Sequence, residues 1–182
     1  MPTPRIHKED KNKIHFLTFT TIEWIDIFTK PEYFNLIINT FKHCQKNQGL
    51  LLYGFVIMTN HIHCLVSANK ESCSLEDIVA SFKKFTTSQT KKLLEKDNRK
   101  YIPALIKSSY SKKKNTSFQI WQRENYPEMI QSKKFFLQKI NYIHNNPVVK
   151  CYVAKPEDWV YSSAKNYLLN DNSLIDINRI VL

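Results

Sequence analysis

Hydrophobic residues recur along this chain with two different periods, and each period predicts one kind of element. Residues 15–21, HFLTFTT, alternate and are rich in β-branched and aromatic side chains, which is typical of a strand. Residues 30–48 instead carry apolar side chains at helical spacing, at Phe34, Ile37, Ile38 and Phe41. Pro31 near the start of this stretch and Gly49 just past its end favour these boundaries for a helix.

Two extended hydrophobic runs come next, and they predict a β-hairpin. The runs cover residues 50–58 and 61–67, and the polar pair Thr59 and Asn60 separates them. A second helix is expected from Ser74 onward, because serine is a favoured N-cap and the acidic residues that follow it suit the helix dipole.

The second half of the chain mixes polar stretches with short apolar runs. Residues 97–117 are rich in lysine and serine and predict a mobile loop, whereas residues 118–122, FQIWQ, predict a short strand. Ser132 is the expected N-cap of a third helix. This helix should end before Pro147, because the residue that precedes a proline disfavours helical backbone.

A turn near Pro156 and a short helix from about Ser162 complete the chain. The predicted order is therefore β-α-β-β-α-β-α, with one hairpin in the middle. Helices that are separated by strands in this way predict an α+β fold, and the natural candidate is a ferredoxin-like sandwich. We expect an antiparallel or mixed sheet with helices mainly on one face, followed by a C-terminal extension.

Composition favours a single globular domain of 182 residues. No apolar run reaches the roughly 18 residues of a membrane helix, and the N-terminus lacks the apolar core of a signal peptide. The two glycines are too few for a glycine-rich phosphate loop. The four cysteines form no CxxC pair, so we expect no zinc ribbon or disulfide framework and predict reduced cysteines in a cytoplasm.

The chain is strongly basic, with a net charge of +11. Lysines gather in pairs and in one triplet, and a field of this sign favours a polyanion such as nucleic acid. Aromatic residues make up 13% of the chain, and such rings can stack on unpaired bases. A solvated basic surface that aids solubility is the alternative explanation.

Two histidines stand one residue apart in the segment TNHIHCLV. Residues i and i+2 of a strand project to one face, so His61 and His63 should point together while Ile62 points into the core. Paired imidazoles can share one metal ion. They can also be ordinary polar residues on an open sheet face, but the apolar flanks mark a central strand, where a polar face favours a site.

The predicted third helix supplies possible partners for this pair. Phe136, Ile140 and Ile143 define its buried stripe. At about 100° per residue, Tyr142 lies about 200° from Ile140, and Asn146 follows one turn later on that same side. Each has an ordinary explanation, since Tyr142 can be an amphipathic surface residue and Asn146 a helix C-cap.

Taken together, three segments resemble a known family. The segments HIH (residues 61–63), YIHNNP (142–147) and PEDWVYSSAKNY (156–167) are similar to the HUH single-tyrosine transposases. More narrowly, they are similar to the REP-associated tyrosine transposases of the insertion-sequence family, from the first strand to about Leu168. The resemblance implies a ferredoxin-like catalytic domain over residues 1–146 and a packed C-terminal extension over residues 147–182.

The resemblance also implies a role for each candidate residue. His61 and His63 would bind Mg²⁺ or Mn²⁺, Asn146 would take the place of the third metal ligand, and Tyr142 would be the nucleophile. The family cuts single-stranded DNA next to imperfect hairpins, leaving a 5′-phosphotyrosine and a free 3′-hydroxyl. The expected partner is therefore single-stranded or hairpin DNA in a bacterial cytoplasm, and relatives work as monomers or homodimers.

Basic side chains would then meet the DNA phosphates. The candidates are Lys83, Lys84, Lys112, Lys113, Lys114 and Arg123, although solvated charges account for them equally well. Two departures concern the surroundings of the site: Thr59 stands where relatives often have proline, and Tyr126 and Pro127 stand where many have a histidine. Three alternatives stay open: a hairpin-binding relative that no longer cuts, a metal-dependent nuclease that uses water, and a replication initiator or relaxase.

Overall fold

A four-stranded antiparallel sheet forms the centre of the molecule, in the order β2-β3-β1-β4. The computed structural model describes residues 6, 10, 12–69, 71, 73–109 and 118–180. The strands are β1 (His15–Thr20), β2 (Leu50–Ile57), β3 (His61–Ala68) and β4 (Glu128–Met129). β3 lies between β2 and β1, so the prediction of a central strand that carries the histidine pair is confirmed.

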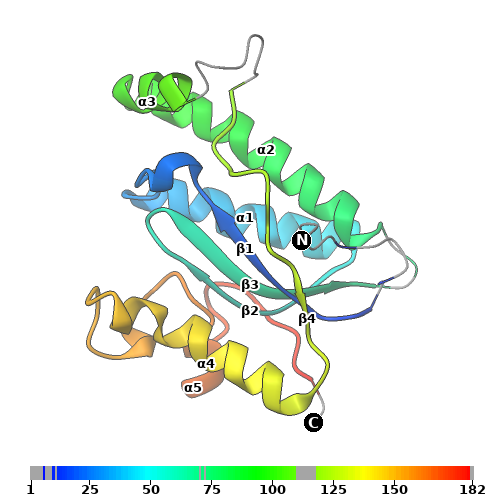
Figure 1. Cartoon of the computed structure of the whole chain (residues 1–182). Helices are drawn as coiled ribbons and strands as arrows, with labels where there is room; N and C mark the ends of the chain where they lie inside the picture. The colour runs from blue at the N-terminus through cyan, green and yellow to red at the C-terminus, as the bar shows by residue number, and fades with distance from the viewer. Residues whose placement is uncertain are drawn as a thin grey trace.

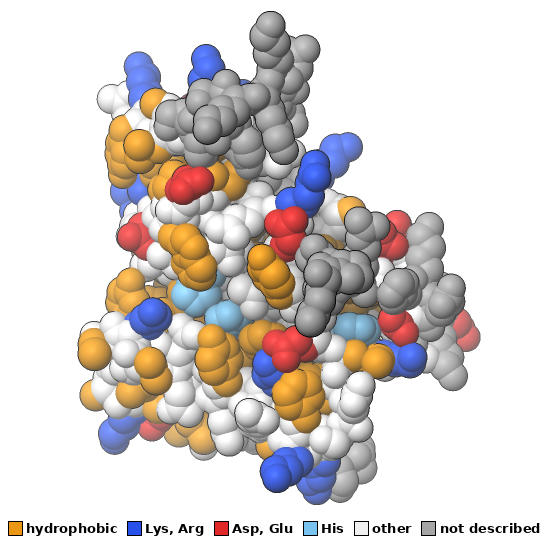
Figure 2. All heavy atoms as spheres, in the orientation of Figure 1, with side chains coloured by type: hydrophobic (Ala, Val, Ile, Leu, Met, Phe, Trp, Pro, Cys, Tyr) orange, Lys and Arg blue, Asp and Glu red, His pale blue; other side chains and the backbone are white. Residues whose placement is uncertain are grey.

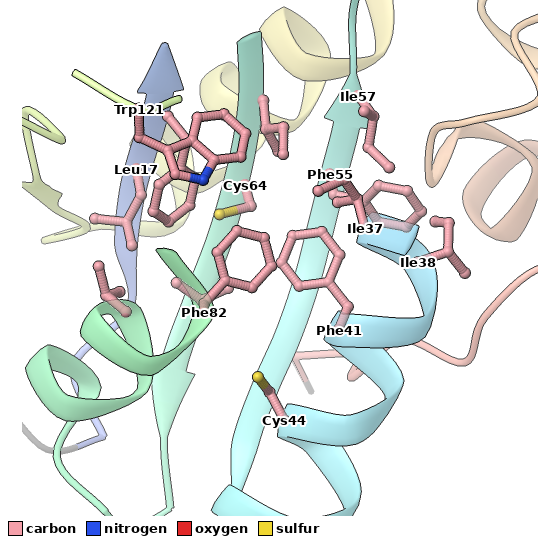
Figure 3. Close-up of a cluster of buried hydrophobic side chains, with 14 of the residues drawn as sticks. Leu17, Ile37, Ile38, Phe41, Cys44, Phe55, Ile57, Cys64, Phe82 and Trp121 are labelled. Atoms are coloured by element: carbon pink, nitrogen blue, oxygen red, sulfur yellow. The ribbon is translucent and has the colours of Figure 1, made fainter. Parts of the chain in front are cut away.

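Two long helices cover one face of the sheet, α1 (Pro31–Gln48) and α2 (Leu75–Lys96) (Figure 1). Figure 3 shows the core between them and the strands. The rings of Phe41 on α1 and Phe82 on α2 meet at 5.1 Å over the strands, and Leu17, Phe55 and Cys64 are buried beneath. This core anchors β1, β2 and β3, and it fixes which side chains face the other way.

The opposite face is covered by α4 (Lys133–Val149) (Figure 1). The buried stripe predicted for this helix is confirmed, since Phe136, Ile140 and Ile143 pack on Phe16, Val56, Met58 and Leu65. A Cβ added at Gly54 of β2 would lie only 2.6 Å from Cδ1 of Ile140, so the glycine allows the close approach of α4. The predicted α+β fold class is confirmed; helices α1 and α2 share one face, whereas α4 takes the other.

Helix boundaries follow the local chemistry. Gly49 ends α1 with a left-handed φ of 72°, as a C-terminal glycine does. The Ser74 side chain accepts a hydrogen bond from the Asp77 backbone N–H at the start of α2. Ser132 does the same for Phe135 at the start of α4. The predicted N-caps of both helices are therefore confirmed.

Two predictions for residues 97–122 were wrong. Residues 101–109 form a helix, α3 (Tyr101–Ser109), because Ile102 and Ile106 lie one turn apart and are both buried. Residues 110–117 of the predicted loop lie outside the described residues. The segment 118–122 is not a strand, since only Trp121 forms an isolated bridge, to Thr21.

The prediction that the third helix stops before Pro147 was also wrong. The helix α4 continues through Pro147 to Val149. A proline removes one N–H from the helix, but here the last turn is closed by other bonds, from the N–H of Lys150 to Asn146 O and from that of Tyr152 to Pro147 O. Pro147 is buried, so packing offsets the lost bond.

The C-terminal part packs along β2. It contains a short 3-10 helix, η3 (Pro156–Asp158), and α5 (Ala164–Leu168), which agree with the predicted turn and short helix. Ser162 bridges Val56, and Asn178 donates its backbone N–H to Leu52 O at 2.7 Å. These contacts cover a strand edge that would otherwise expose unpaired backbone groups. None of the described helices combines the length and the apolar character that a membrane span requires.

Candidate active site

The two predicted histidines point to the same side of the sheet. The ring centroids of His61 and His63 are 4.8 Å apart, and Phe16 of β1 stacks on His63 at 5.3 Å. Ile62, between them, is buried in the core on the opposite face. The two-residue period of β3 therefore places both imidazoles on the face that α4 covers.

Helix α4 brings a phenol directly to this pair. The hydroxyl of Tyr142 lies 3.4 Å from Nε2 of His63, and the two ring centroids are 5.1 Å apart. The side chain of Tyr142 is 51% exposed, whereas its neighbours on the buried stripe are covered. Tyr142 is thus in contact with His63 and open to solvent.

Hydrogen bonds fix the orientation of both imidazoles. Nδ1 of His61 lies 2.8 Å from Oδ1 of Asn60, and a carboxamide oxygen only accepts, so Nδ1 carries the proton. Nδ1 of His63 lies 2.9 Å from Oγ1 of Thr18, which can accept in the same way. Nε2 of His61 then keeps its lone pair for a ligand, and Nε2 of His63 does so when Thr18 accepts from its Nδ1.

Both histidines are neutral at neutral pH. Burial lowers the pKa of His61 to about 4, assisted by the charge of Lys150, while contact with Asn146 opposes the shift. Burial lowers the pKa of His63 to about 3, and repulsion from His61 and Lys139 acts in the same direction. A neutral imidazole is the form that binds a metal ion.

Asn146 completes the arrangement from one turn further along α4. Its side chain is 7% exposed, and its Oδ1 atom is buried without a hydrogen-bond partner among the described residues. An unpaired buried oxygen is costly unless something binds it. No group of three His, Cys, Asp or Glu residues that could hold a metal occurs in the part of the chain that the structure describes. The donors that do converge are two imidazoles and this carboxamide oxygen, which together suit a divalent cation.

Sequence reasoning missed Asn60 and Thr18, the two residues that orient the imidazoles. Asn60 precedes His61 in the turn between the strands, so its position was a signal that could have been used. Thr18 is brought to His63 by the register of β1 against β3, in which the two residues are partners. That register depends on pairing between distant segments, which one sequence does not reveal.

Three of the six predicted basic residues share one groove, and the other three lie outside the described residues. Lys83, Lys84 and Arg123, together with Lys91, line a groove of about 490 Å³ between α2 and residues 118–123. Lys83 donates to the carbonyls of Gln122 at 2.7 Å and Arg123 at 3.1 Å, and burial lowers its pKa to about 8. Lys83 therefore ties α2 to that segment. The structure does not describe Lys112, Lys113 and Lys114.

Comparisons with known proteins confirm the resemblance stated above. No protein-family model matches the chain. An uncharacterized protein of Haemophilus influenzae is 25% identical over 122 residues, which cover 61% of this chain and 64% of that protein, so less than two thirds of the relative is matched. A second protein of that organism, which carries the provisional name REP-associated tyrosine transposase, is 25% identical over 132 residues, 72% of this chain and 69% of its own.

A solved structure has the same fold over its full length. It is the structure of a REP-associated tyrosine transposase bound to a REP hairpin, with a TM-score of 0.70, 16% sequence identity and coverage of 100% of both chains. At this identity, the likeness shows that the two proteins share their fold.

Proposed function

We propose, from its likeness to REP-associated tyrosine transposases, that this protein cleaves and rejoins single-stranded DNA near hairpins through a 5′-phosphotyrosine. The observation that carries the proposal is the 3.4 Å contact between the Tyr142 hydroxyl and His63 Nε2. A surface tyrosine that serves solubility alone is not expected to contact a buried pair of imidazoles. The contact therefore supports a nucleophile that acts at an ion held by those imidazoles.

In this proposal His61, His63 and Asn146 hold Mg²⁺ or Mn²⁺. The buried, unpaired Oδ1 of Asn146 and the unprotonated Nε2 of His61 support such a ligand set. A divalent cation bound there would withdraw electron density from a non-bridging phosphate oxygen and neutralise charge in the transition state. Asn60 and Thr18 would keep the imidazoles aimed at it.

Tyr142 attacks the scissile phosphorus with its hydroxyl oxygen. The new bond joins that oxygen to the 5′-phosphate and the bond to the 3′ oxygen breaks. The phenol loses its proton, and the freed 3′ oxygen gains one as it becomes a 3′-hydroxyl, so the step balances. The phosphotyrosine conserves the energy of the broken ester bond, so a 3′-hydroxyl can later displace Tyr142 and restore a continuous strand. Lys139 lies 4.3 Å over the ring of Phe16 beside Tyr142, and its ammonium is paired with the Glu128 carboxylate at 2.7 Å.

DNA would also bind in the groove between α2 and residues 118–123. Lys84, Lys91 and Arg123 carry the phosphate contacts there, while Lys83 holds the two walls together. Such contacts release counterions, so affinity should fall steeply with salt. The groove residues and the catalytic residues belong to one chain, which supports a site that is complete in a monomer. In this proposal, residues 1–146 are the catalytic domain and residues 147–182 are an extension of it.

The test is a covalent adduct. Wild-type protein is incubated with a hairpin oligonucleotide that carries single-stranded extensions, with Mn²⁺, and then resolved on a denaturing gel. We expect a protein–DNA adduct that is absent from Tyr142→Phe, while Tyr101→Phe, a change to another exposed tyrosine, on α3, serves as the matched control. Cleavage without an adduct would favour a nuclease that uses water, and tight binding without cleavage would favour a hairpin-binding module.

A further inference from the structure

A solvent-exposed tryptophan stands beside the first histidine. The indole of Trp24 is 57% exposed, although Ile22 and Ile27 on either side in sequence are buried. Its ring meets that of His61 edge-on, with centroids 5.8 Å apart. Figure 2 shows hydrophobic side chains next to pale-blue histidines on this face. A large ring left in water at the edge of a site points to a ligand that covers it.

The backbone that carries Trp24 is strained and firmly tied. Glu23 and Trp24 have φ values of 52° and 55°, in the left-handed region that residues other than glycine rarely adopt. The N–H of Trp24 donates to Thr21 O at 3.2 Å, and Oγ1 of Thr21 donates to Ile25 O at 2.9 Å. Such strain persists only where the surroundings hold it, and it gathers at ligand-binding positions.

One side chain joins this turn to the histidine pair. Nδ2 of Asn60 donates to Trp24 O at 3.2 Å, while its Oδ1 accepts from Nδ1 of His61 at 2.8 Å. The position of the indole is therefore set relative to His61 by a single carboxamide. A hydrogen-bonded link of this kind, from Trp24 through Asn60 to His61, is not expected for a surface aromatic residue that plays no part in the site.

We propose that Trp24 is a stacking platform for an unpaired nucleobase of the DNA strand, next to the phosphate that Tyr142 attacks. The inference rests on the proposed function and adds a binding subsite to it. An indole presents a flat face that stacks on any base, and stacking holds a single strand without reading its sequence. A base held beside His61 would bring its own phosphate toward the imidazoles and Tyr142.

The experiment measures binding to two probes that differ only in their bases. One is a DNA hairpin with a short oligothymidine extension, and the other carries abasic sites throughout the same extension; divalent metal is left out so that no cleavage occurs. For wild type, removal of the bases should weaken binding on the order of tenfold. Trp24→Ala should weaken binding of the complete probe by a similar factor and leave the affinity for the abasic probe unchanged.

Two further variants separate stacking from simple apolar contact. Trp24→Leu keeps an apolar side chain but has no ring face, so it should behave as Trp24→Ala, whereas Trp24→Phe should retain most of the affinity. Phe85→Ala, which removes an exposed ring on α2, is the matched control and should match wild type. Thermal unfolding of each variant checks that the fold is intact.

The inference is overturned if wild type binds both probes equally, or if Trp24→Ala weakens both by the same factor. Either result would leave the proposed function standing, because the adduct assay with Tyr142 is independent of it. If wild type binds no hairpin and forms no adduct, the proposed function fails, and the stacking subsite fails with it.

Discussion

Asn60 Oδ1 accepts a hydrogen bond from Nδ1 of His61 at 2.8 Å, so the residue before the first histidine decides which ring nitrogen faces the site. We predict that Asn60→Ala lowers the affinity for Mn²⁺ by roughly 10- to 100-fold, the usual cost of losing a partner that orients a ligand. The measurement is a calorimetric titration of the metal-free protein with Mn²⁺.

Asn47→Ala is the matched control for this change. Asn47 also bonds a histidine, at 3.0 Å to Nδ1 of His43, but this pair lies on the exposed side of α1. We expect no change in Mn²⁺ affinity for the control. Equal loss in both variants would mean that the effect is not specific to the His61 site.

Asn146 offers a second test of the metal site, because its two possible roles predict opposite results. If Asn146 is a metal ligand, Asn146→Ala should lower the affinity for Mn²⁺ at least about tenfold. It should change the free energy of unfolding of the metal-free protein by less than about 1 kcal/mol, since the buried Oδ1 has no partner to lose among the described residues. As a structural cap, the same change would destabilise the metal-free protein and leave any Mn²⁺ binding intact. Urea unfolding and Mn²⁺ titration of one variant decide between them.

The parts of the site that follow from a local period were predictable from sequence. The two-residue period of a strand pairs His61 with His63, and the helical period turns Tyr142 away from Ile140. The contact between these elements is set by sheet register and helix packing, which join residues far apart in the chain. Thr18 was missed for this reason.

Two of the wrong predictions, for α3 and for the end of α4, each have a local cause. α3 looked like a loop because its nine residues lie inside the segment 97–117, which as a whole is rich in lysine and serine. Pro147 looked like a stop because the residue before a proline disfavours helical backbone, whereas in the fold Pro147 is buried and other hydrogen bonds close the last turn.

Acid should destabilise the metal-free protein, because burial lowers the pKa of several histidines. The pKa of His144, which bonds Oγ of Ser163 at 2.8 Å, is lowered to about 4, again by burial. Below a pH of about 6.5, histidines of the unfolded chain bind protons, whereas the buried histidines of the folded protein stay neutral. The free energy of unfolding therefore falls as the pH drops from about 6.5 toward about 4. Each such group contributes a slope of up to about 1.4 kcal/mol per pH unit in that window, and none at higher pH.

Removing one of these groups should reduce the acid sensitivity. We predict that His144→Gln is less stable than wild type at pH 7, because a buried hydrogen bond changes, but loses less stability between pH 6 and pH 5. Urea unfolding at each pH gives the comparison. His43→Gln, at an exposed position on α1, is the control, and an unchanged slope in His144→Gln would contradict the prediction.

Gly54 and Ile140 together set how closely α4, with Tyr142, approaches the sheet. A Cβ at position 54 would meet Cδ1 of Ile140 at 2.6 Å, so Gly54→Ala should destabilise the protein by about 1–3 kcal/mol. Ile140→Val removes that very carbon at a cost of about 0.5–1.5 kcal/mol. The double variant should therefore be more stable than the sum of the single changes predicts, and the excess is the coupling that a double-mutant cycle measures by urea unfolding. Adduct formation should follow the same pattern, reduced by Gly54→Ala and recovered in the double variant, because the clash displaces the helix that carries the phenol. Strict additivity of the two stability changes would contradict the prediction, because it would show that a Cβ at position 54 and Cδ1 of Ile140 do not interact.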